Sequence, residues 1–312
     1  DLYITNYEVH FGGPINPDGF YLTRPDGTFE APVNLAGKWA WTARGANWAD
    51  FDNDGDQDLY VSNYRLMPNQ LWVNDGRGRF DDQAKARGVY GEARAGKEPA
   101  SAYYPAYEYT GHTIGSCWGD LDNDGNLDLV VVNFSHQPAF QNRVQVAINS
   151  GPPDYRFTNI NKDAAAGIYW QESYAKGALG DYDNDGDLDL YITTVYPRDR
   201  GDLFENDGTG RFTWRGGHSD VRLIESICAA DYDADGFLDI YVCGYGFDQH
   251  HIGPKAPIPY HDANNGEANA LLRNDGKFRF LNVTESVGLD VNNSRFSFAA
   301  AWEDYDNDGD LD

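Results

Sequence analysis

Short runs of leucine, β-branched and aromatic residues recur along the chain, and each of them follows an acidic stretch. They lie at 59–61, 129–131, 190–192 and 240–242. Residues of these kinds favour strands. Other apolar runs lead into Asn-Asp-Gly, or a looser version of it, which is a strong hairpin signal. We therefore predict four strands in each repeat, one before the acidic stretch, one after it, and two joined by the turn.

The turn motif is clearest at 69–80, where Asn74, Asp75 and Gly76 separate two apolar runs. It recurs at 202–212 and 269–278, and more loosely at 21–29 and 144–157. Helical patterns are short, as at 83–87 and 162–166. Repeats with four strands each predict an all-β fold, a β-propeller of four-stranded blades.

The acidic stretches are nine-residue loops at 50–58, 120–128, 181–189, 231–239 and 304–312. In all five, positions one, three, five and nine are Asp and position six is Gly. This spacing suits a hard cation that takes several oxygen ligands, and Gly permits the sharp turn. Position seven varies and is Phe237 in the fourth loop, so we assign its main-chain carbonyl as the ligand.

We therefore predict about one calcium ion in each complete loop. The predicted ligands are Asp50, Asp52, Asp54, Asp56 and Asp58; Asp120, Asp122, Asp124, Asn126 and Asp128; Asp181, Asp183, Asp185, Asp187 and Asp189; Asp231, Asp233, Asp235, Phe237 and Asp239; and Asp304, Asp306, Asp308, Asp310 and Asp312.

Three other interpretations of the loops are an EF-hand, a dockerin-like pair and solvated acidic turns. An EF-hand needs Glu at position twelve and a helix after the loop, but that position holds Val61, Val131, Ile192 or Val242. A dockerin-like pair would also continue into helices. Solvated acidic turns remain an alternative because Asp is a common turn residue, although a turn by itself does not require carboxylates at four fixed positions.

The distribution of charge supports metal binding. The loops hold 23 of the 50 acidic residues, and the other 27 nearly balance the 24 Lys and Arg. The formal net charge of −26 is therefore concentrated in the loops. No basic stripe exists to displace counterions from phosphates, so nucleic acid is not an expected partner. No apolar run approaches the roughly 20 residues of a membrane helix, so no membrane span is expected.

The repeat also predicts the domain organisation. Residues 1–7 match 58–64 almost position for position, so five periods are visible, at 1–57, 58–127, 128–188, 189–238 and 239–312. We predict a single propeller domain over 1–312, cut from a longer array, with no initiator Met or signal-peptide pattern at its start. Three cysteines are too few for a disulfide framework. A disulfide between Cys228 and Cys243 is one alternative, and buried free thiols are favoured.

The run from the Asp-rich loop through its strand to Asn-x-Leu-Trp-x-Asn-Asp-Gly at 69–76 resembles the FG-GAP/VCBS repeat family, and within it the cartilage acidic protein group. The resemblance implies a calcium-binding propeller, commonly seven-bladed, that is secreted, periplasmic or on the cell surface. It also implies that the first, third, fifth and ninth Asp of each loop bind calcium. The Phe-Gly-Gly-Ala-Pro element of integrin repeats is absent, so adhesion partners are not implied.

The long connections of variable length should lie on the blade face opposite the calcium loops, where binding sites are common. One insertion contains Tyr103, Tyr104, Tyr107, Tyr109 and His112, and another contains His250, His251 and His261. Clustered Tyr beside polar groups suits recognition of a protein or a carbohydrate. The alternative is that these rings only pack a long loop. The three histidines could also bind a transition metal, although their spacing fits no recognised site.

The predicted function is a calcium-stabilised propeller for protein or glycan binding, adhesion or extracellular assembly. The alternative is a polysaccharide lyase or hydrolase that uses Tyr109, His112 or His261 on the long-loop face. No Gly-x-Ser-x-Gly elbow, His-Glu-x-x-His motif or phosphate-binding loop is present, so catalysis is the less favoured hypothesis. The tripeptide Arg-Gly-Asp at 200–202 is interpreted as a coincidence, since Asp202 aligns with Asn69 at a strand start.

Overall fold

The computed structural model describes residues 1–6, 16–93, 96–99, 105–135, 143–162, 167–168, 173–195, 201–218, 224–248, 253–254 and 256–312. Two compact units divide the chain. The first contains Asp1–Trp118 and Gly125–Ile160, and the second contains Gly119–Asp124 and Asn161–Asp312. The described secondary structure is almost entirely antiparallel β-sheet, which confirms the predicted all-β class.

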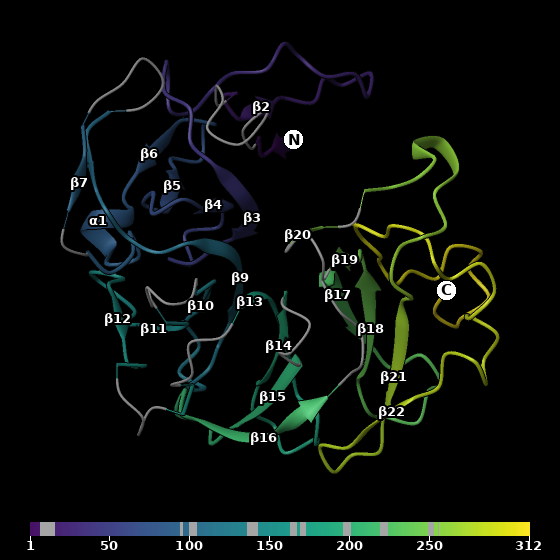
Figure 1. Cartoon of the computed structure of the whole chain (residues 1–312). Coiled ribbons are helices and arrows are strands. Elements are labelled where there is room, and N and C mark those ends of the chain that lie inside the picture. Colours follow the sequence, from purple (N-terminus) through teal and green to yellow (C-terminus); the bar gives the residue numbers. More distant parts are fainter. Residues whose placement is uncertain are drawn as a thin grey trace. The chain divides into compact units, whose positions relative to one another are not determined.

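Two four-stranded sheets form from the first half of the chain (Figure 1). One contains β3 (Ala43–Ala49), β4 (Asp58–Asn63), β5 (Gln70–Asn74) and β6 (Phe80–Asp82). The other contains β9 (Thr113–Gly119), β10 (Asp128–Asn133), β11 (Gln145–Asn149) and β12 (Phe157–Asn159). Smaller elements are the pair β1 (Leu2–Ile4) and β2 (Gly19–Tyr21), the pair β7 (Lys97–Glu98) and β8 (Tyr107–Glu108), and α1 (Ala84–Arg87).

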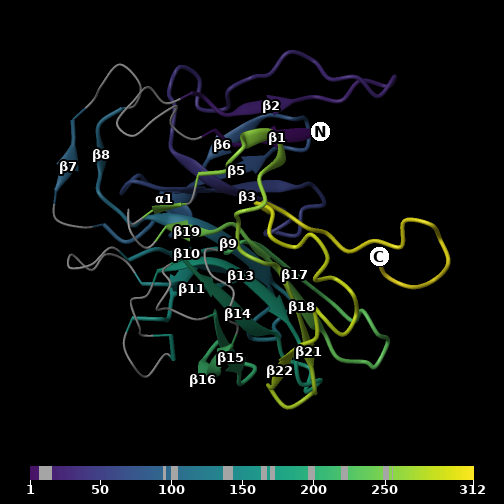
Figure 2. The same ribbon diagram turned by 45° about the vertical axis from the view of Figure 1, so that its right-hand side comes forward.

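The second unit repeats this plan. Its first sheet contains β13 (Tyr174–Gly180), β14 (Asp189–Thr194), β15 (Gly201–Asn206) and β16 (Phe212–His218). Its second sheet contains β17 (Ile224–Ala230), β18 (Asp239–Gly244), β21 (Ala270–Asn274) and β22 (Phe280–Asn282), which are neighbours in both views (Figure 2). Between β18 and β21 lie β19 (Phe247–Asp248), β20 (Gly253–Pro254) and the 3₁₀ helix η2 (Tyr260–Asp262).

Strand order in every four-stranded sheet follows the chain, so neighbouring strands are joined without a crossover. The acidic loop connects the first and second strands in four repeats, as predicted. The third and fourth strands are connected by the Asn-Asp-Gly turn in three of these repeats and by the looser version, Asn-Ser-Gly at 149–151, in the other. In the first sheet the strand before the acidic loop, β3, pairs with the strand after it, β4. The natural structural unit begins one strand before the acidic loop.

Burial explains why the second strand of each sheet is so apolar. Every described side chain of β4, β10 and β14 is buried, because these central strands have packed side chains on both faces. The main core of the first unit contains Phe51, Tyr60, Leu71, Leu129, Val131 and Phe157 among others. The core of the second unit contains Tyr182, Tyr191, Leu203, Ile240, Leu272 and Phe280 among others.

The minor predictions have mixed outcomes. The helix expected at 83–87 is present as α1 and ends at Gly88, which has a left-handed φ of 94°. The pattern at 162–166 lies mostly outside the described residues. The looser hairpin at 21–29 forms as an isolated bridge between Thr23 and Phe29. In the part of the chain that the structure describes, no helix has the length and apolar character to cross a membrane.

Four-stranded repeated sheets are thus established. The closed propeller, its number of blades and the single domain over 1–312 stay predictions, since each compact unit is described by itself.

Candidate metal loops

The backbone of the acidic loops is nearly identical in all five copies. Position six is Gly with φ between 89° and 100°, as predicted. Position four is also left-handed, with φ between 55° and 61°. The sequence analysis missed this second position, although Asn occupies it in four loops and tolerates left-handed backbone better than most residues. The fourth loop is the exception, with Ala234 at this position.

The carboxylate at position one closes the loop on itself. Asp181 Oδ1 and Oδ2 accept hydrogen bonds from the backbone N–H groups of Asp185 and Gly186, both at 3.1 Å. Asp50 makes the equivalent pair of contacts at 3.0 Å. Both carboxylate oxygens are therefore fixed in direction before any ion binds. The last loop, 304–312, has the same arrangement around Asp304.

The carboxylate at position nine is buried and joins the loop to the turn. Asp58, Asp128, Asp189 and Asp239 are each at most 1 % exposed. Asp189 Oδ1 accepts the N–H of Asn206 at 3.0 Å, and its Oδ2 accepts the N–H of Tyr182 at 3.0 Å. Burial raises the pKa of Asp189 to about 7 even though these hydrogen bonds lower it. Position nine therefore has a structural role besides any role in metal binding.

The carboxylate at position three has a different environment. Asp52 Oδ1 and Asp122 Oδ1 are buried without a hydrogen-bond partner among the described residues. Burial, followed by the nearby Asp54 or Asp124, raises the pKa of these two carboxyl groups. A buried carboxylate oxygen without a donor is costly, and a cation would remove that cost.

Carboxylates at positions one, three and nine converge in four loops, with one oxygen of each residue within 4.8 Å of the others. The groups are Asp50, Asp52 and Asp58; Asp120, Asp122 and Asp128; Asp181, Asp183 and Asp189; and Asp231, Asp233 and Asp239. Oxygen ligands at this spacing, together with unpartnered oxygens at position three, fit a hard divalent cation. The repeated Asp clusters could hold metal ions.

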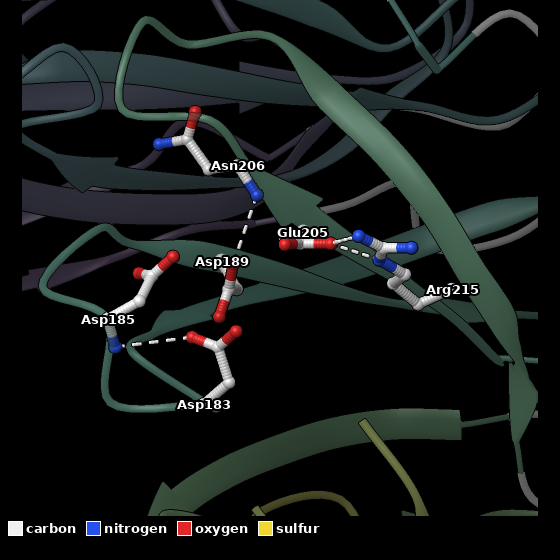
Figure 3. Close-up of polar contacts among 6 residues, drawn as sticks. All are labelled: Asp183, Asp185, Asp189, Glu205, Asn206 and Arg215. Carbon is white, nitrogen blue, oxygen red and sulfur yellow. Dashed lines mark hydrogen bonds and ion pairs between the residues drawn. The ribbon is translucent and has the colours of Figure 1, made fainter. Parts of the chain in front are cut away.

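A further carboxylate, Glu205, was missed by the sequence analysis. It groups with Asp183 and Asp185 within 4.8 Å and forms an ion pair with Arg215 (Figure 3). No motif marks it, because the corresponding residue before the turn asparagine differs in each repeat.

The side chain at position seven lies against the turn. A Cβ on Gly76 would be 3.1 Å from Asp56 Oδ2, and one on Gly208 would be 2.7 Å from Asp187 Oδ2. The ring of Phe237 lies in the same place, 2.4 Å from a Cβ on Gly276. This placement explains why the turn requires Gly, and it is compatible with position seven supplying only its carbonyl.

Turn asparagines connect successive repeats. Asn274 Nδ2 donates to the carbonyl of Tyr182, in the preceding loop, at 2.6 Å and to Leu238, in its own loop, at 3.1 Å. Asn206 Nδ2 likewise donates to the carbonyl of Leu121 in the preceding loop and to that of Leu188 in its own loop. Asn149 Nδ2 donates to the carbonyl of Phe51 in the preceding loop and to that of Leu127 in its own loop. The Asn of the turn motif therefore serves two loops at once.

Of the residues predicted for ligand binding, the structure describes Tyr107, Tyr109, His112 and His261. Tyr107 and Tyr109 pack with Trp41 and Met67, which is the packing alternative of the sequence analysis. His112 lies against the Tyr64 ring at 4.5 Å, and its Nδ1 accepts a hydrogen bond from the N–H of Arg65. Tyr103, Tyr104, His250 and His251 lie outside the described residues, and His261 is exposed in η2.

Two further expectations concern Asp202 and the cysteines. Asp202 accepts hydrogen bonds from Tyr174 Oη at 2.9 Å and Trp214 Nε1 at 3.0 Å, so it has structural partners within its sheet. Cys228 and Cys243 are free thiols on the adjacent strands β17 and β18, as the sequence favoured. Burial raises the pKa of Cys228 to about 11, so this thiol is not activated as a nucleophile.

Comparison with known proteins places the chain in a family. Residues 1–61, 50–131, 120–192 and 181–242 each match the model of the FG-GAP-like repeat. These matches together cover most of the chain, which therefore belongs to the FG-GAP-like repeat family. No curated protein matches it. The finer resemblance to cartilage acidic protein stays a prediction.

Two solved structures are similar over part of their length. One is an Agrocybe aegerita lectin that recognises non-reducing terminal N-acetylglucosamine, at 17 % identity and a TM-score of 0.46, with 86 % of this chain and 60 % of the lectin covered. The other is the V. cholerae biofilm matrix protein Bap1, at 10 % identity and a TM-score of 0.37, with 80 % of this chain and 40 % of Bap1 covered. The chain thus spans less than two thirds of either protein.

Proposed function

We propose that this chain is part of a calcium-stabilised β-propeller that acts outside the cell or at its surface and binds a protein or a carbohydrate. The observation that carries the calcium part is the convergence of three carboxylates in four successive loops, two of which have a buried position-three oxygen without a donor among the described residues. The ligands are the Asp residues at positions one, three, five and nine and the carbonyl at position seven. Calcium would supply positive charge that these loops otherwise lack.

A propeller is supported by the contacts between repeats. Asn149, Asn206 and Asn274 each donate a hydrogen bond to a carbonyl of the preceding loop, so the same contact recurs along the chain. A recurring contact between successive four-stranded repeats is what a propeller requires. The number of blades in the intact protein is proposed to be about seven, from the family resemblance.

The calcium part is tested by thermal unfolding of the chain in calcium, in chelator, and in magnesium at matched ionic strength. Calcium saturation at 100 times its Kd adds about 2.7 kcal/mol for each site, so several sites should raise the unfolding midpoint strongly. Magnesium prefers a smaller octahedral shell and should raise the midpoint much less. Equal midpoints in calcium and chelator would reject calcium binding and leave solvated acidic turns as the explanation.

The binding part is tested by applying the labelled chain to an array of defined glycans and to immobilised extracellular matrix proteins, in calcium and in chelator. Saturable binding that is lost in chelator supports the proposal. If the calcium loops are saturated and the chain binds neither a glycan nor a matrix protein, the proposal that it binds a ligand is contradicted. The proposal that it binds calcium would still stand.

A further inference from the structure

The four sheets place one residue directly across from the ninth Asp of each loop. The ladders pair Leu190 with Phe204 and Ile240 with Leu272. The next residues along them, Glu205 and Arg273, therefore stand opposite Asp189 and Asp239. By the same register, Val73 is opposite Asp58 in the first sheet and Ile148 is opposite Asp128 in the second. Directly opposed residues of an antiparallel pair project from the same face, so this position is beside the loop in every repeat.

In the third loop this position carries a negative charge. A carboxylate oxygen of Glu205 lies within 4.8 Å of oxygens of Asp183 and Asp185. Arg215, on the neighbouring strand β16, pairs with Glu205 from the side away from the loop (Figure 3). The side chain of Glu205 is 22 % exposed, so its charge is only partly screened by water.

In the fourth loop the same position carries a positive charge. Arg273 is exposed on β21, and its charge acts on Tyr232 at position two of that loop. The fourth loop also has Phe237 at position seven, where the third has Asp187. Two neighbouring loops of the same backbone geometry thus differ strongly in local charge.

We propose that the residue opposite the ninth Asp ranks the calcium affinities of these two loops, with Glu205 strengthening the third and Arg273 weakening the fourth. The third loop then fills at a lower calcium concentration than the fourth. The reason is that the charge count around a calcium loop is a main determinant of its affinity. This inference rests on the calcium binding proposed above.

Calcium titration calorimetry on the whole chain tests the ranking, with Glu205→Gln and Arg273→Gln as the two variants. Each has a matched control that changes the same charge at another exposed site, Glu285→Gln and Lys162→Gln. We expect Glu205→Gln to weaken calcium binding at the third loop about tenfold, and Arg273→Gln to tighten binding at the fourth loop roughly threefold to tenfold. Both effects should shrink in high salt, and the controls should stay within about twofold.

Asp181→Asn and Asp231→Asn identify the calcium-binding steps of the third and fourth loops, because each variant should remove one step. Adding Glu205→Gln to Asp181→Asn should change nothing further. If the step lost in Asp231→Asn is as tight as the step lost in Asp181→Asn, or if Glu205→Gln and Glu285→Gln behave equally, the ranking is overturned. Circular dichroism in chelator checks folding, and if Glu205→Gln does not fold, the exposed Arg273 decides the question. A wild-type chain that binds no calcium rejects the proposed function itself, which is a separate result.

Discussion

The acidic loops and the connection at 105–112 both join strands, but they are held in different ways. Each loop closes through its own backbone, with Asp181 accepting two N–H groups within five residues. The connection is held by residues distant in sequence, such as His112 with Tyr64 and Arg65. The conformation of a repeated segment can be predicted from its motif. The conformation of a segment that occurs once depends on contacts with residues distant in sequence. Function in the loops is accordingly better supported than function in the connection.

The largest expected effect separates structural from metal-binding carboxylates within one loop. Asp189→Asn should lower the free energy of unfolding by about 3–5 kcal/mol in chelator, because an amide N–H₂ would face a backbone N–H in a buried site, and by more in calcium, because a proposed calcium ligand is also lost. Asp183→Asn should destabilise the chain only in calcium. Urea unfolding of both variants in both conditions measures this. Equal loss for the two variants in chelator would show that position nine has no special structural role.

Next in size is the connection between repeats. Asn274→Ala removes two side-chain hydrogen bonds to carbonyls in two loops, so we expect a loss of about 2–4 kcal/mol in urea unfolding that chelator does not abolish. Asn264→Ala, at an exposed position, is the matched control. If the two variants lose the same stability, the asparagine contacts between repeats do not matter.

Loop carboxylates should also give the metal-free chain an unusual pH dependence. Burial raises the pKa of Asp58 and Asp189 to about 7 and that of Asp239 to about 6. Because these pKa values exceed the ordinary value of about 4 in the unfolded chain, the folded state binds more protons between about pH 4 and pH 7. Stability in chelator should therefore fall as pH rises through this window, with a midpoint several degrees lower at pH 7.5 than at pH 5.

Calcium should reverse that trend, since the ion binds the deprotonated carboxylates and its affinity increases with pH. Differential scanning calorimetry at both pH values, with calcium and with chelator, provides the measurement. A midpoint in chelator that rises between pH 5 and pH 7.5 would contradict the raised pKa values.

The connection at 105–112 should contribute to stability without affecting the metal. His112→Ala removes an acceptor for the Arg65 N–H and a ring contact with Tyr64, and should cost about 1–2 kcal/mol. Calcium affinity measured by calorimetry should stay at the wild-type value. A changed calcium affinity would show that the connection at 105–112 and the acidic loops are coupled, and it would contradict their separate roles.

The smallest effect concerns the left-handed residue at position four. Ala234 has a φ of 56°, which Asn tolerates better, so Ala234→Asn should stabilise the chain by about 0.5–1 kcal/mol. Asn53→Ala, with a φ of 55°, should cost a similar amount. Thermal unfolding of the two variants is the check, and shifts of the same sign would contradict the explanation.

The sequence by itself determined the strands, the acidic loops and the turns, because these depend on local constraints. Strand formers, Gly at position six and the Asn-Asp-Gly turn act over a few residues and recur in phase, so each copy supports the others. The sequence also marked Asp at positions one and nine, although it did not distinguish their structural from their metal-binding roles.

Tertiary structure alone decided the contacts across long separations. Asn274 reaches Tyr182, which is 92 residues earlier in the chain, and no local pattern could reveal this partner. Glu205 and Arg273 acquire their relation to the loops only through strand register. The physical reason is that a hydrogen bond or a charge acts through space, and only the folded sheets bring these side chains within its range.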